Sequence, residues 1–307
     1  MINRPDFSII IVSWNTRELT LHAIQSVYDQ HESNVEIIVV DNASSDDTIK
    51  AVTARFPDVR IIANSENLGY AHANNQGMRQ ARGDYFVLLN SDAELKSMGL
   101  LHTIKSTFET HPKTGILGGT LRLTSGAIQA VGRQFLTFNR LVKQQLLFNS
   151  APMFKDKAVE SDRLIFVDYV DGAFLAIPAR VVQDIGFMRA DFFMYGEDME
   201  WCARASLFGW DVAVLPSLEI LHHHAASSKQ NFRRILVQNA LNNCRFLADH
   251  EMLLRAKQAF IVYLGGMLLR VPLSILRRNG LALDYWNAFR DCLKLQSRLK
   301  TELTGRS

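Results

Sequence analysis

The sequence lacks the motifs by which several nucleotide-binding folds and metal-binding domains are usually recognised. Its three cysteines, Cys202, Cys244 and Cys292, are widely spaced and form neither a disulfide framework nor a metal-ligand pattern. Neither G-x-G-x-x-G nor G-x-x-x-x-G-K-[ST] follows the first predicted strand, which excludes the usual dinucleotide-binding fold and the P-loop. The chain has no internal repeat and no low-complexity segment. These absences indicate a globular protein of a reducing compartment.

Targeting and membrane-spanning signals are also scarce. Met1–Asp6 is polar and leads directly into an apolar strand, so we expect no secretory signal. The stretch Ala259–Leu269 is apolar but shorter than the ~20 residues that span a bilayer. Arg270 and Pro272 then interrupt it. We therefore expect a cytoplasmic protein without a spanning helix.

Composition and charge define the broad class. With 307 residues, 48% hydrophobic and 21% charged, the chain suits one α/β domain plus an appendage. Residues 251–307 hold ten Lys/Arg and four Asp/Glu, a net charge of +6, whereas the remainder has a net charge of −3. A basic, apolar-rich tail on a mildly acidic body favours an anionic partner, and lipid is the first candidate rather than nucleic acid.

Apolar stretches of strand length alternate with helical periodicity in the first half of the chain. Thr16 is a candidate cap for the first helix, and Ser44–Asp47 supplies caps and acids for the second. The alternation predicts a doubly wound α/β fold with a mostly parallel central sheet. The predicted strands are 7–12, 35–40, 59–63 and 85–89, and a helix is expected at 71–81.

Each predicted strand ends in polar side chains. The clearest case is Tyr85–Leu89, whose apolar run closes on Asn90, Ser91 and Asp92. Ligands of open parallel sheets bind beyond the carboxyl ends of the strands, so these side chains would converge on one edge. Independent caps and turns are the alternative, but the joint pattern favours a binding site. The strand-end residues are Ser13, Asp41, Asn64 and Asp92.

The middle of the chain is less regular. A helix is expected at 100–110 and strands at 115–119 and 170–177, with a helix beginning after Pro178. Arg133–Phe148 mixes apolar and basic residues without a clear period. We interpret it as a variable segment near the site.

Two further clusters carry candidate chemistry. Five aromatic and apolar residues precede Glu197, Asp198 and Glu200 at a predicted helix start. Acids there can simply complement the helix dipole, but a carboxylate beside an apolar pocket is also a plausible general base. Three histidines, His222, His223 and His224, follow the last predicted strand. They form either an exposed turn or a partner for Asp92 at a metal site.

Seven motifs in order give the chain a resemblance to a known family. They are IVSWN, VVDNASSDDT, NLGYAHANNQG, LLNSDAEL, DGAFLAIP, FFMYGEDMEWCAR and LHHHAASS. Their order and spacing over residues 6–230 resemble glycosyltransferase family 2, and within it the rhamnosyltransferase-type enzymes that build bacterial surface polysaccharides such as O-antigen. The resemblance implies an α/β GT-A fold with a Rossmann-like, mostly parallel sheet, helices on both faces and a C-terminal helical extension. It implies a catalytic domain at 1–230, with a nucleotide-binding half of about 1–119 and an acceptor half of about 120–230, followed by a helical region at 231–307.

The resemblance also implies roles for particular residues. Asp198, the second acid of the GED motif, would be the catalytic base of an inverting transfer, with Glu197 and Trp201 on the acceptor side. Asp92 would hold Mg²⁺ or Mn²⁺ against the donor diphosphate, with His222 as the best-matching histidine and His224 as the fallback. The residues implied for the nucleotide sugar are Ser13, Asp41, Asn67, Asn75, Ser91 and Asp92.

The sequence departs from the family pattern in two places. The metal motif, often written with two carboxylates, is Asn90-Ser91-Asp92 and offers one. The usual GGFDE appears as Ile185-Gly-Phe-Met-Arg-Ala190, so acceptor contacts there are expected to differ.

Several alternatives stay open. The implied partners are a dTDP- or UDP-sugar, with the sugar itself undetermined, and a lipid-linked glycan acceptor. Amphipathic helices in the C-terminal region would place the protein peripherally on the inner face of the cell membrane; packing on the catalytic domain or on a second subunit, as in a homodimer, is the alternative. A nucleotidyltransferase is the second hypothesis, and it is disfavoured because Ser13–Arg17 lacks the glycine-rich loop of that class. An inactive sugar-nucleotide-binding module is the third hypothesis.

Overall fold

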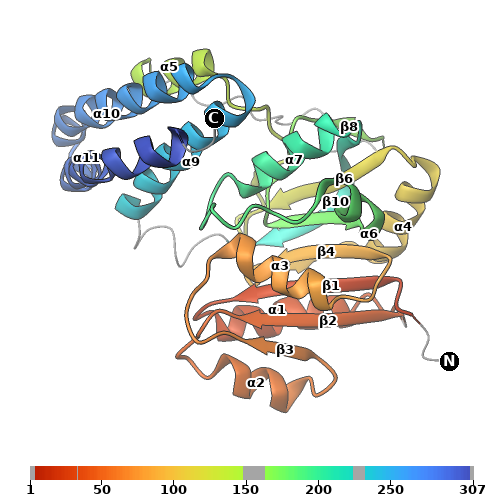
Figure 1. The fold of residues 1–307 in the computed structure, drawn as a ribbon. Helices are drawn as coiled ribbons and strands as arrows, with labels where there is room; N and C mark the ends of the chain where they lie inside the picture. Colours follow the sequence, from red (N-terminus) through yellow and green to blue (C-terminus); the bar gives the residue numbers. More distant parts are fainter. Residues whose placement is uncertain (1–3, 33, 148–162, 224–231, 305–307) are drawn as a thin grey trace. The chain divides into compact units, whose positions relative to one another are not determined.

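The computed structural model describes residues 4–32, 34–147, 163–223 and 232–304. The chain divides into two compact units, each considered by itself (Figure 1). One comprises Met1–Phe135 and Met153–His224, and the other comprises Leu136–Pro152 and Ala225–Ser307. The second unit therefore takes its chain from two separate stretches of the sequence.

Within the described residues, the first unit is built on a ten-stranded sheet in the order β3-β2-β1-β4-β9-β6-β10-β5, with β7 on β6 and β8 on β10. The strands are β1 (Phe7–Ser13), β2 (Val35–Asp41), β3 (Arg60–Ala63), β4 (Tyr85–Asn90), β5 (Ala93–Leu95), β6 (Thr114–Arg122), β7 (Ile128–Ala130), β8 (Ile165–Phe166), β9 (Phe174–Pro178) and β10 (Asp211–His222).

The four strands predicted from the N-terminal half are parallel neighbours, as expected. β1 lies between β2 and β4, and Ser13 is in register with Asp41 while Val12 is in register with Asn90. The polar ends of these strands therefore reach the same edge of the sheet. β9 then joins β4 antiparallel, so the sheet becomes mixed beyond its parallel half.

Alternate residues of the strands enter two apolar layers, one on each face of the sheet. Ile9 and Ile11 pack with α1 (Arg17–Tyr28), α2 (Thr48–Arg55) and α4 (Leu100–Thr110). Ile10 packs on the opposite face with α3 (Tyr70–Gln80), α6 (Ala179–Ile185) and α7 (Glu197–Leu207) (Figure 1). Burial on both faces explains the continuous apolar runs of these strands, and it confirms the α/β prediction.

One prediction about the middle of the chain was wrong. Residues Phe138–Leu146, expected to be irregular, form helix α5, whose cap Thr137 accepts a hydrogen bond from the Arg140 amide. Residues Asp211–His222 form one long strand, β10, whose pairing with β6 shifts register between Val214 and Glu219.

The second unit is helical. Its helices share an apolar core that includes Leu141, Leu241, Phe260 and Cys292. The elements are α5 together with α9 (Phe232–His250), α10 (Leu253–Leu276) and α11 (Ala282–Thr304).

Arg270 joins α5 to α10. Its guanidinium donates to the carbonyls of Gln144 and Gln145, at 2.9 Å each, at the C-terminal end of α5. A cation is favourable at this helix end, where carbonyls lack intrahelical partners. The charge that we expected to interrupt an apolar stretch instead caps a neighbouring helix.

Helix α10 is longer than the sequence indicated. It continues through Arg270 and Pro272 to Leu276, so these two residues interrupt the apolar run but not the helix. Pro272 lies near the C-terminal end of α10, where the loss of one backbone donor affects few remaining turns. In the described part of the chain, α10 alone is long and apolar enough to cross a membrane, judged by length and composition. A core helix of a soluble protein passes the same test, and 33% of its most apolar window is buried.

Candidate active site

The side chains of Asp92 and His222 lie in contact at the carboxyl edge of the sheet. The Asp92 Oδ1 lies 3.2 Å from the His222 Nε2, and the two side chains are 23% and 7% exposed. His222 ends β10 in register with Ala93 of β5, which sets the ring beside the carboxylate. Its Nδ1 is hydrogen-bonded to the Gln129 Oε1 at 2.7 Å, so the ring is held from both sides.

The three consecutive histidines have separate positions. His223 turns its Nε2 to the Glu94 Oε1, at 2.5 Å, while its backbone amide donates to the Asp92 carbonyl. His224 lies outside the described residues. Among the described histidines, His222 is therefore the one beside Asp92.

Asp198 lies in the first turn of α7 and is bound to the loop before β9. Its Oδ2 accepts from the Gly172 amide at 3.0 Å, and its Oδ1 accepts from the Met199 amide at 2.7 Å. The Tyr70 hydroxyl donates to the Gly172 carbonyl. One glycine thus positions both the candidate base and a half-buried tyrosine from α3.

A short path of hydrogen bonds connects Asp198 with Asp92. Gly172 holds Asp198, and the carbonyl of the next residue, Ala173, accepts from the Asn90 amide at 3.0 Å. Asp92 follows Asn90 by two residues. Burial, and then the nearby acids Glu197, Asp171 and Asp92, raise the pKa of Tyr195, so Tyr195 has acids of both motifs in its neighbourhood. The two carboxylates predicted from distant motifs therefore lie at the same end of the sheet.

The electrostatic environment suits Asp198 to proton transfer. Burial, and then the negative charge of Asp171, raises the pKa of Asp198 to about 6. The two backbone amides and the positive charge of Arg133 oppose this rise. A carboxylate with this pKa is ionised at neutral pH and is basic enough to accept a proton from a hydroxyl.

Glu197 and Trp201, the two residues predicted for the acceptor side, lie in different environments. Glu197 is 5% exposed, and its Oε2 has no hydrogen-bond partner in the described part of the chain. Burial, and then the charge of Asp198, raises its pKa well above the usual range, which favours the neutral acid. Trp201 is fully buried, and its indole N–H donates to the Gly186 carbonyl. The structure therefore places Trp201 in the core and not on an acceptor surface.

Hydroxyl groups link the start of α1 to the end of β4. Thr16 donates to the Ser91 Oγ at 2.8 Å and lies 3.1 Å from the Ser13 Oγ. Thr16 occupies the N-cap position of α1, as predicted, but its side chain makes no capping hydrogen bond, and Asp46 accepts a hydrogen bond from the Arg17 amide. Ser13 and Ser91, both predicted for the nucleotide sugar, are thus brought together through Thr16.

Asp41 retains an unused acceptor. It is 1% exposed, and its Oδ2 accepts from the Ser44 amide at 2.9 Å, whereas its Oδ1 has no hydrogen-bond partner among the described residues. A buried carboxylate oxygen without a donor is costly unless a ligand supplies one. This atom is the feature that best fits the predicted contact with a nucleobase N–H.

Asn67 and Asn75 have structural partners. The Asn67 Oδ1 accepts from the Gly69 amide and closes the turn before α3. The Asn75 amide group both donates to and accepts from the backbone of Met188, at 2.7 and 3.1 Å. Because these bonds occupy the Asn75 side chain, it fixes the loop before α7, and its predicted contact with nucleotide stays untested.

Gly69 brings the nucleotide side of the unit against the loop that carries Tyr195. It has a φ of +84°, and a Cβ built on it would lie 2.3 Å from the Phe193 carbonyl oxygen. The Tyr70 amide donates to this same carbonyl at 2.9 Å. Tyr195, with a φ of +70°, then turns the chain into α7. A strained residue at this point is typical of functional loops.

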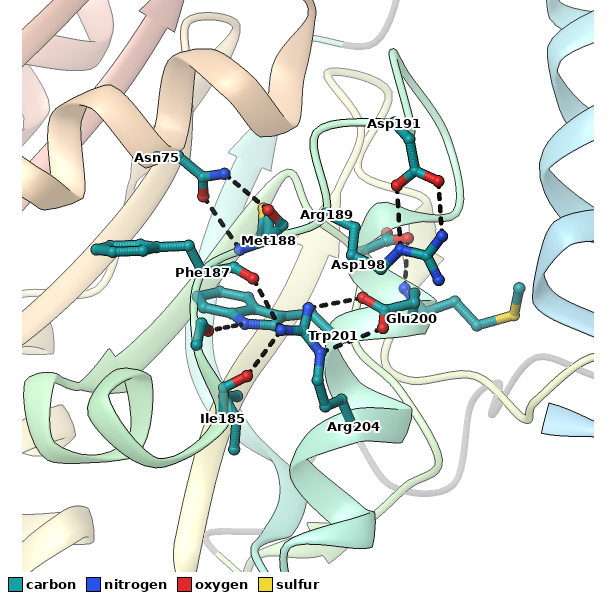
Figure 2. Close-up of polar contacts among 12 residues, drawn as sticks. Asn75, Ile185, Phe187, Met188, Arg189, Asp191, Asp198, Glu200, Trp201 and Arg204 are labelled. Atoms are coloured by element: carbon teal, nitrogen blue, oxygen red, sulfur yellow. Dashed lines mark hydrogen bonds and ion pairs between the residues drawn. The ribbon is translucent and has the colours of Figure 1, made fainter. Parts of the chain in front are cut away.

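Figure 2 shows how the loop before α7 is held. Arg204 donates to the carbonyls of Ile185 and Phe187, at 2.7 and 2.9 Å, and pairs with Glu200 at 2.8 Å. Glu200, one of the three acids of this motif, is therefore committed to Arg204. Of the three, Asp198 is the ionised carboxylate that no side-chain cation binds directly in the described residues.

The sequence missed several residues of this site. Tyr70, Asp171 and Gly172 lie within quoted motifs, but only the fold shows that they surround Asp198. Arg133, which pairs with Asp171 at 2.9 Å, came from the segment that we considered irregular. No sequence signal distinguished it from its neighbours.

The residues present fit a divalent metal in part. No cluster of three or more His, Cys, Asp or Glu able to hold a metal ion occurs in the described residues. Asp92 and His222 supply one oxygen and one nitrogen donor, types that Mg²⁺ or Mn²⁺ accept together with ligand oxygens. A metal bound there would need oxygens from the substrate.

Comparison with known proteins identifies a family and several proteins to which this chain is similar. The family model "Glycosyl transferase family 2" matches residues 8–159, about half of the chain. N-acetylglucosaminyl-diphospho-decaprenol L-rhamnosyltransferase of Mycobacterium tuberculosis is 26% identical over 89% of this chain and 89% of its own. The low-salt glycan biosynthesis hexosyltransferase Agl10 of Haloferax volcanii is 25% identical over 80% of this chain and 76% of its own. The mannosyltransferase PcManGT of Pyrobaculum calidifontis, solved with GDP-Man and Mn²⁺, superposes with a TM-score of 0.57 at 18% identity, over 97% of this chain and 86% of its own.

The fold is thus that of the GT-A class of glycosyltransferases, with C-terminal helices added. The chain belongs to glycosyltransferase family 2.

Proposed function

We propose that the protein is an inverting glycosyltransferase that moves a hexose from a dTDP- or UDP-sugar to a lipid-linked glycan acceptor in surface polysaccharide synthesis. Rhamnose is the first candidate sugar because a relative similar over most of both chains is named as an L-rhamnosyltransferase. That relative's name also describes a lipid diphosphate acceptor. Another hexose is the alternative.

One observation carries the proposal: the Asp92–His222 pair and Asp198 lie at the same sheet end, joined through Asn90, Ala173 and Gly172. A transferase needs one group of charges for the leaving diphosphate and a separate base for the acceptor. Asp92, just before β5, and His222, at the end of β10, would supply the first through a bound divalent cation, and the ionised carboxylate on α7 serves as the second.

The reaction is a single displacement. The acceptor hydroxyl gives its proton to the Asp198 carboxylate as its oxygen bonds to the anomeric carbon, and the bond from that carbon to the diphosphate oxygen breaks. One base on the attacking face is sufficient, and attack opposite the leaving group inverts the anomeric configuration. Asp41, through its Oδ1, holds the nucleobase, while Ser13, Thr16 and Ser91 line the same edge.

Asp92 and His222 would hold Mg²⁺ or Mn²⁺, which offsets the negative charge of the leaving diphosphate. His222 has its Nδ1 bound by Gln129, which fixes the ring for this role.

Helix α10 supports a membrane-associated acceptor. Leu254, Ile261, Leu268 and Ile275 recur every seven residues and are between 40% and 68% exposed. This spacing places them along one face of the helix. Arg277 and Arg278 follow and are exposed. An apolar face with adjacent cations suits the surface of an anionic bilayer at the inner face of the cell membrane.

Nucleotide recognition is tested by thermal shift with dTDP, UDP and GDP, each with Mn²⁺. One nucleotide should raise the Tm of the wild type, and Asp41→Ala should lose that rise while Asp58→Ala, exposed on a loop of the same unit, keeps it. Hydrolysis of the matching nucleotide sugar without acceptor then tests transfer chemistry. A protein that no nucleotide stabilises and that turns over no nucleotide sugar would contradict the proposal.

Membrane association is tested by co-sedimentation with vesicles containing anionic lipid. Ile261→Glu combined with Leu268→Glu should abolish binding, whereas Ile49→Glu, a comparably exposed apolar residue on α2, should not. Equal binding by all three proteins would count against the face on α10.

A further inference from the structure

Arg133 is held in place by its backbone. It pairs with Tyr169 in an isolated bridge: its amide donates to the Tyr169 carbonyl at 2.9 Å, and its carbonyl accepts from the amides of Asp168 and Tyr169. The Phe135 and Tyr169 rings stack beside it with centroids 6.2 Å apart. A residue fixed in this way has the direction of its Cα–Cβ bond determined, and the contact with Asp171 then orients the guanidinium.

Its guanidinium is only partly used by the protein. The terminal nitrogen Nη2 donates to the Asp171 Oδ2 at 2.9 Å, and the side chain is 27% exposed. In the part of the chain that the structure describes, its remaining N–H groups have no hydrogen-bond partner. Arginine presents five donors in a planar fork, so most of the fork remains available for a ligand.

The position of this fork relative to the candidate base is defined by two adjacent residues. Asp171 pairs with Arg133, and the next residue, Gly172, donates to the Asp198 carboxylate at 3.0 Å. The charge of Arg133 acts on Asp198, and that of Asp198 acts on Arg133. The fork therefore lies close to the group that receives the acceptor proton.

We propose that Arg133 binds the diphosphate of a lipid-linked acceptor sugar and so selects acceptors that carry this group. The inference rests on the proposed function, because it needs Asp198 to be the acceptor base. A sugar with its reacting hydroxyl at Asp198 has its anomeric diphosphate one ring away, which matches a cation in this neighbourhood. The leaving diphosphate of the donor is the other source of the same chemistry, but the Asp92–His222 pair serves that group.

The chemistry of the Arg133–Asp171 pair favours phosphate binding over a purely structural role. A guanidinium fork matches two oxygens of one phosphate, and a partner carboxylate on one edge orients the other edge. Asp171 is itself held, because its Oδ1 accepts from the Ala173 amide at 3.2 Å. The acids around Asp198 would otherwise repel an anion, so a cation is needed at this position.

The test compares two acceptors: N-acetylglucosamine linked through diphosphate to a farnesyl chain, and the same sugar as an octyl glycoside. Arg133→Met should raise the KM for the diphosphate acceptor by about 10- to 100-fold, the usual weight of hydrogen bonds to a charged group. The KM for the octyl glycoside and for the nucleotide sugar should not change. Arg133→Lys should recover only part of the loss, since it keeps the charge without the fork.

A matched control is Arg60→Met. Arg60 pairs with Glu36 at 3.1 Å, is 35% exposed and begins β3, at the opposite edge of the sheet from the site. It should leave every KM unchanged. An equal loss for both acceptors in Arg133→Met, or a raised KM for the nucleotide sugar, would overturn the inference, because it would indicate a structural role or a donor contact.

Calorimetry with farnesyl diphosphate, in the presence of saturating UDP or dTDP, makes the test independent of turnover. The wild type should bind the probe and Arg133→Met should bind it at least about 10-fold more weakly, with equal affinity for the nucleotide. Equal binding of the probe by both proteins, or no binding by the wild type, would overturn the role of Arg133. Hydrolysis of nucleotide sugar would still proceed in that case, so failure of this inference is distinguishable from failure of the proposed function.

Discussion

Replacing Asp198 with asparagine should remove the base while keeping most of the local shape. The carboxylate accepts hydrogen bonds from two amides, those of Gly172 and Met199, at 3.0 and 2.7 Å. An asparagine offers one acceptor oxygen, so one of the amides would face the side-chain NH₂. The local loss of stability should be about 1–3 kcal/mol, partly offset because a buried charge is also removed.

The effect on turnover should be much larger than the effect on folding. Loss of a positioned base typically lowers the rate about 10²–10⁴-fold, which corresponds to about 3–5 kcal/mol of barrier. The assay is release of nucleoside diphosphate in the presence of acceptor, with donor KM measured separately. Donor KM should be nearly unchanged, because none of the residues proposed to contact the nucleotide sugar lies on α7.

A matched change elsewhere controls for the chemistry of the substitution. Asp184→Asn on α6 alters an exposed carboxylate outside the GED motif, which accepts from the Trp210 indole at 3.2 Å. It should retain full activity. If Asp198→Asn kept more than about a tenth of wild-type turnover, well above the range expected for a lost base, its assignment as the base would be refuted.

Three further outcomes are expected. The kcat/KM should fall about tenfold for each pH unit below about 6, because the pKa of Asp198 is raised to about 6 and only the ionised form accepts a proton. Asp171→Asn should move this acidic limb to lower pH, since the change removes a negative charge that raises the pKa of Asp198. A pH–rate profile without such a limb would count against both expectations. His222→Gln should raise the Mn²⁺ concentration for half-maximal activity about 10- to 100-fold, as measured by metal titration of the chelated enzyme; an unchanged titration would exclude it as a ligand. Gly69→Ala should destabilise the first unit by about 1–3 kcal/mol in denaturant unfolding, because its φ is +84° and the added Cβ meets the Phe193 carbonyl at 2.3 Å; wild-type stability would contradict this account.

The N-terminal, parallel half of the sheet was largely predictable from local patterns. Apolar runs such as Tyr85–Leu89 are buried on both faces of a parallel sheet, and their length and polar ends reveal both strand and edge. Asp92, Asp198 and His222 were identified because they occupy short motifs, and the structure brings all three to one end of the sheet.

What the sequence did not predict depends on contacts between distant residues. Trp201 occurs in an aromatic, acidic motif, yet its side chain is fully buried. The Gly186 carbonyl accepts its indole N–H, which satisfies the one polar group of the buried ring. Arg133 matters through Asp171, thirty-eight positions away. Arg270 was expected only to interrupt an apolar stretch, and the structure shows that it also binds the carbonyls of α5. Neither periodicity nor propensity encodes such pairings.

The membership of α5 in the helical unit has a practical consequence for dissecting the protein. A stop codon or protease cut near residue 230 would remove α9, α10 and α11 but leave α5 attached to the catalytic chain. Leu141 would then lose its apolar neighbours, and the last carbonyls of α5 would lose Arg270. Truncating the chain at its C-terminal end therefore exposes the apolar face of a helix in the middle of the sequence. Separating the two units also requires excision of the segment around α5.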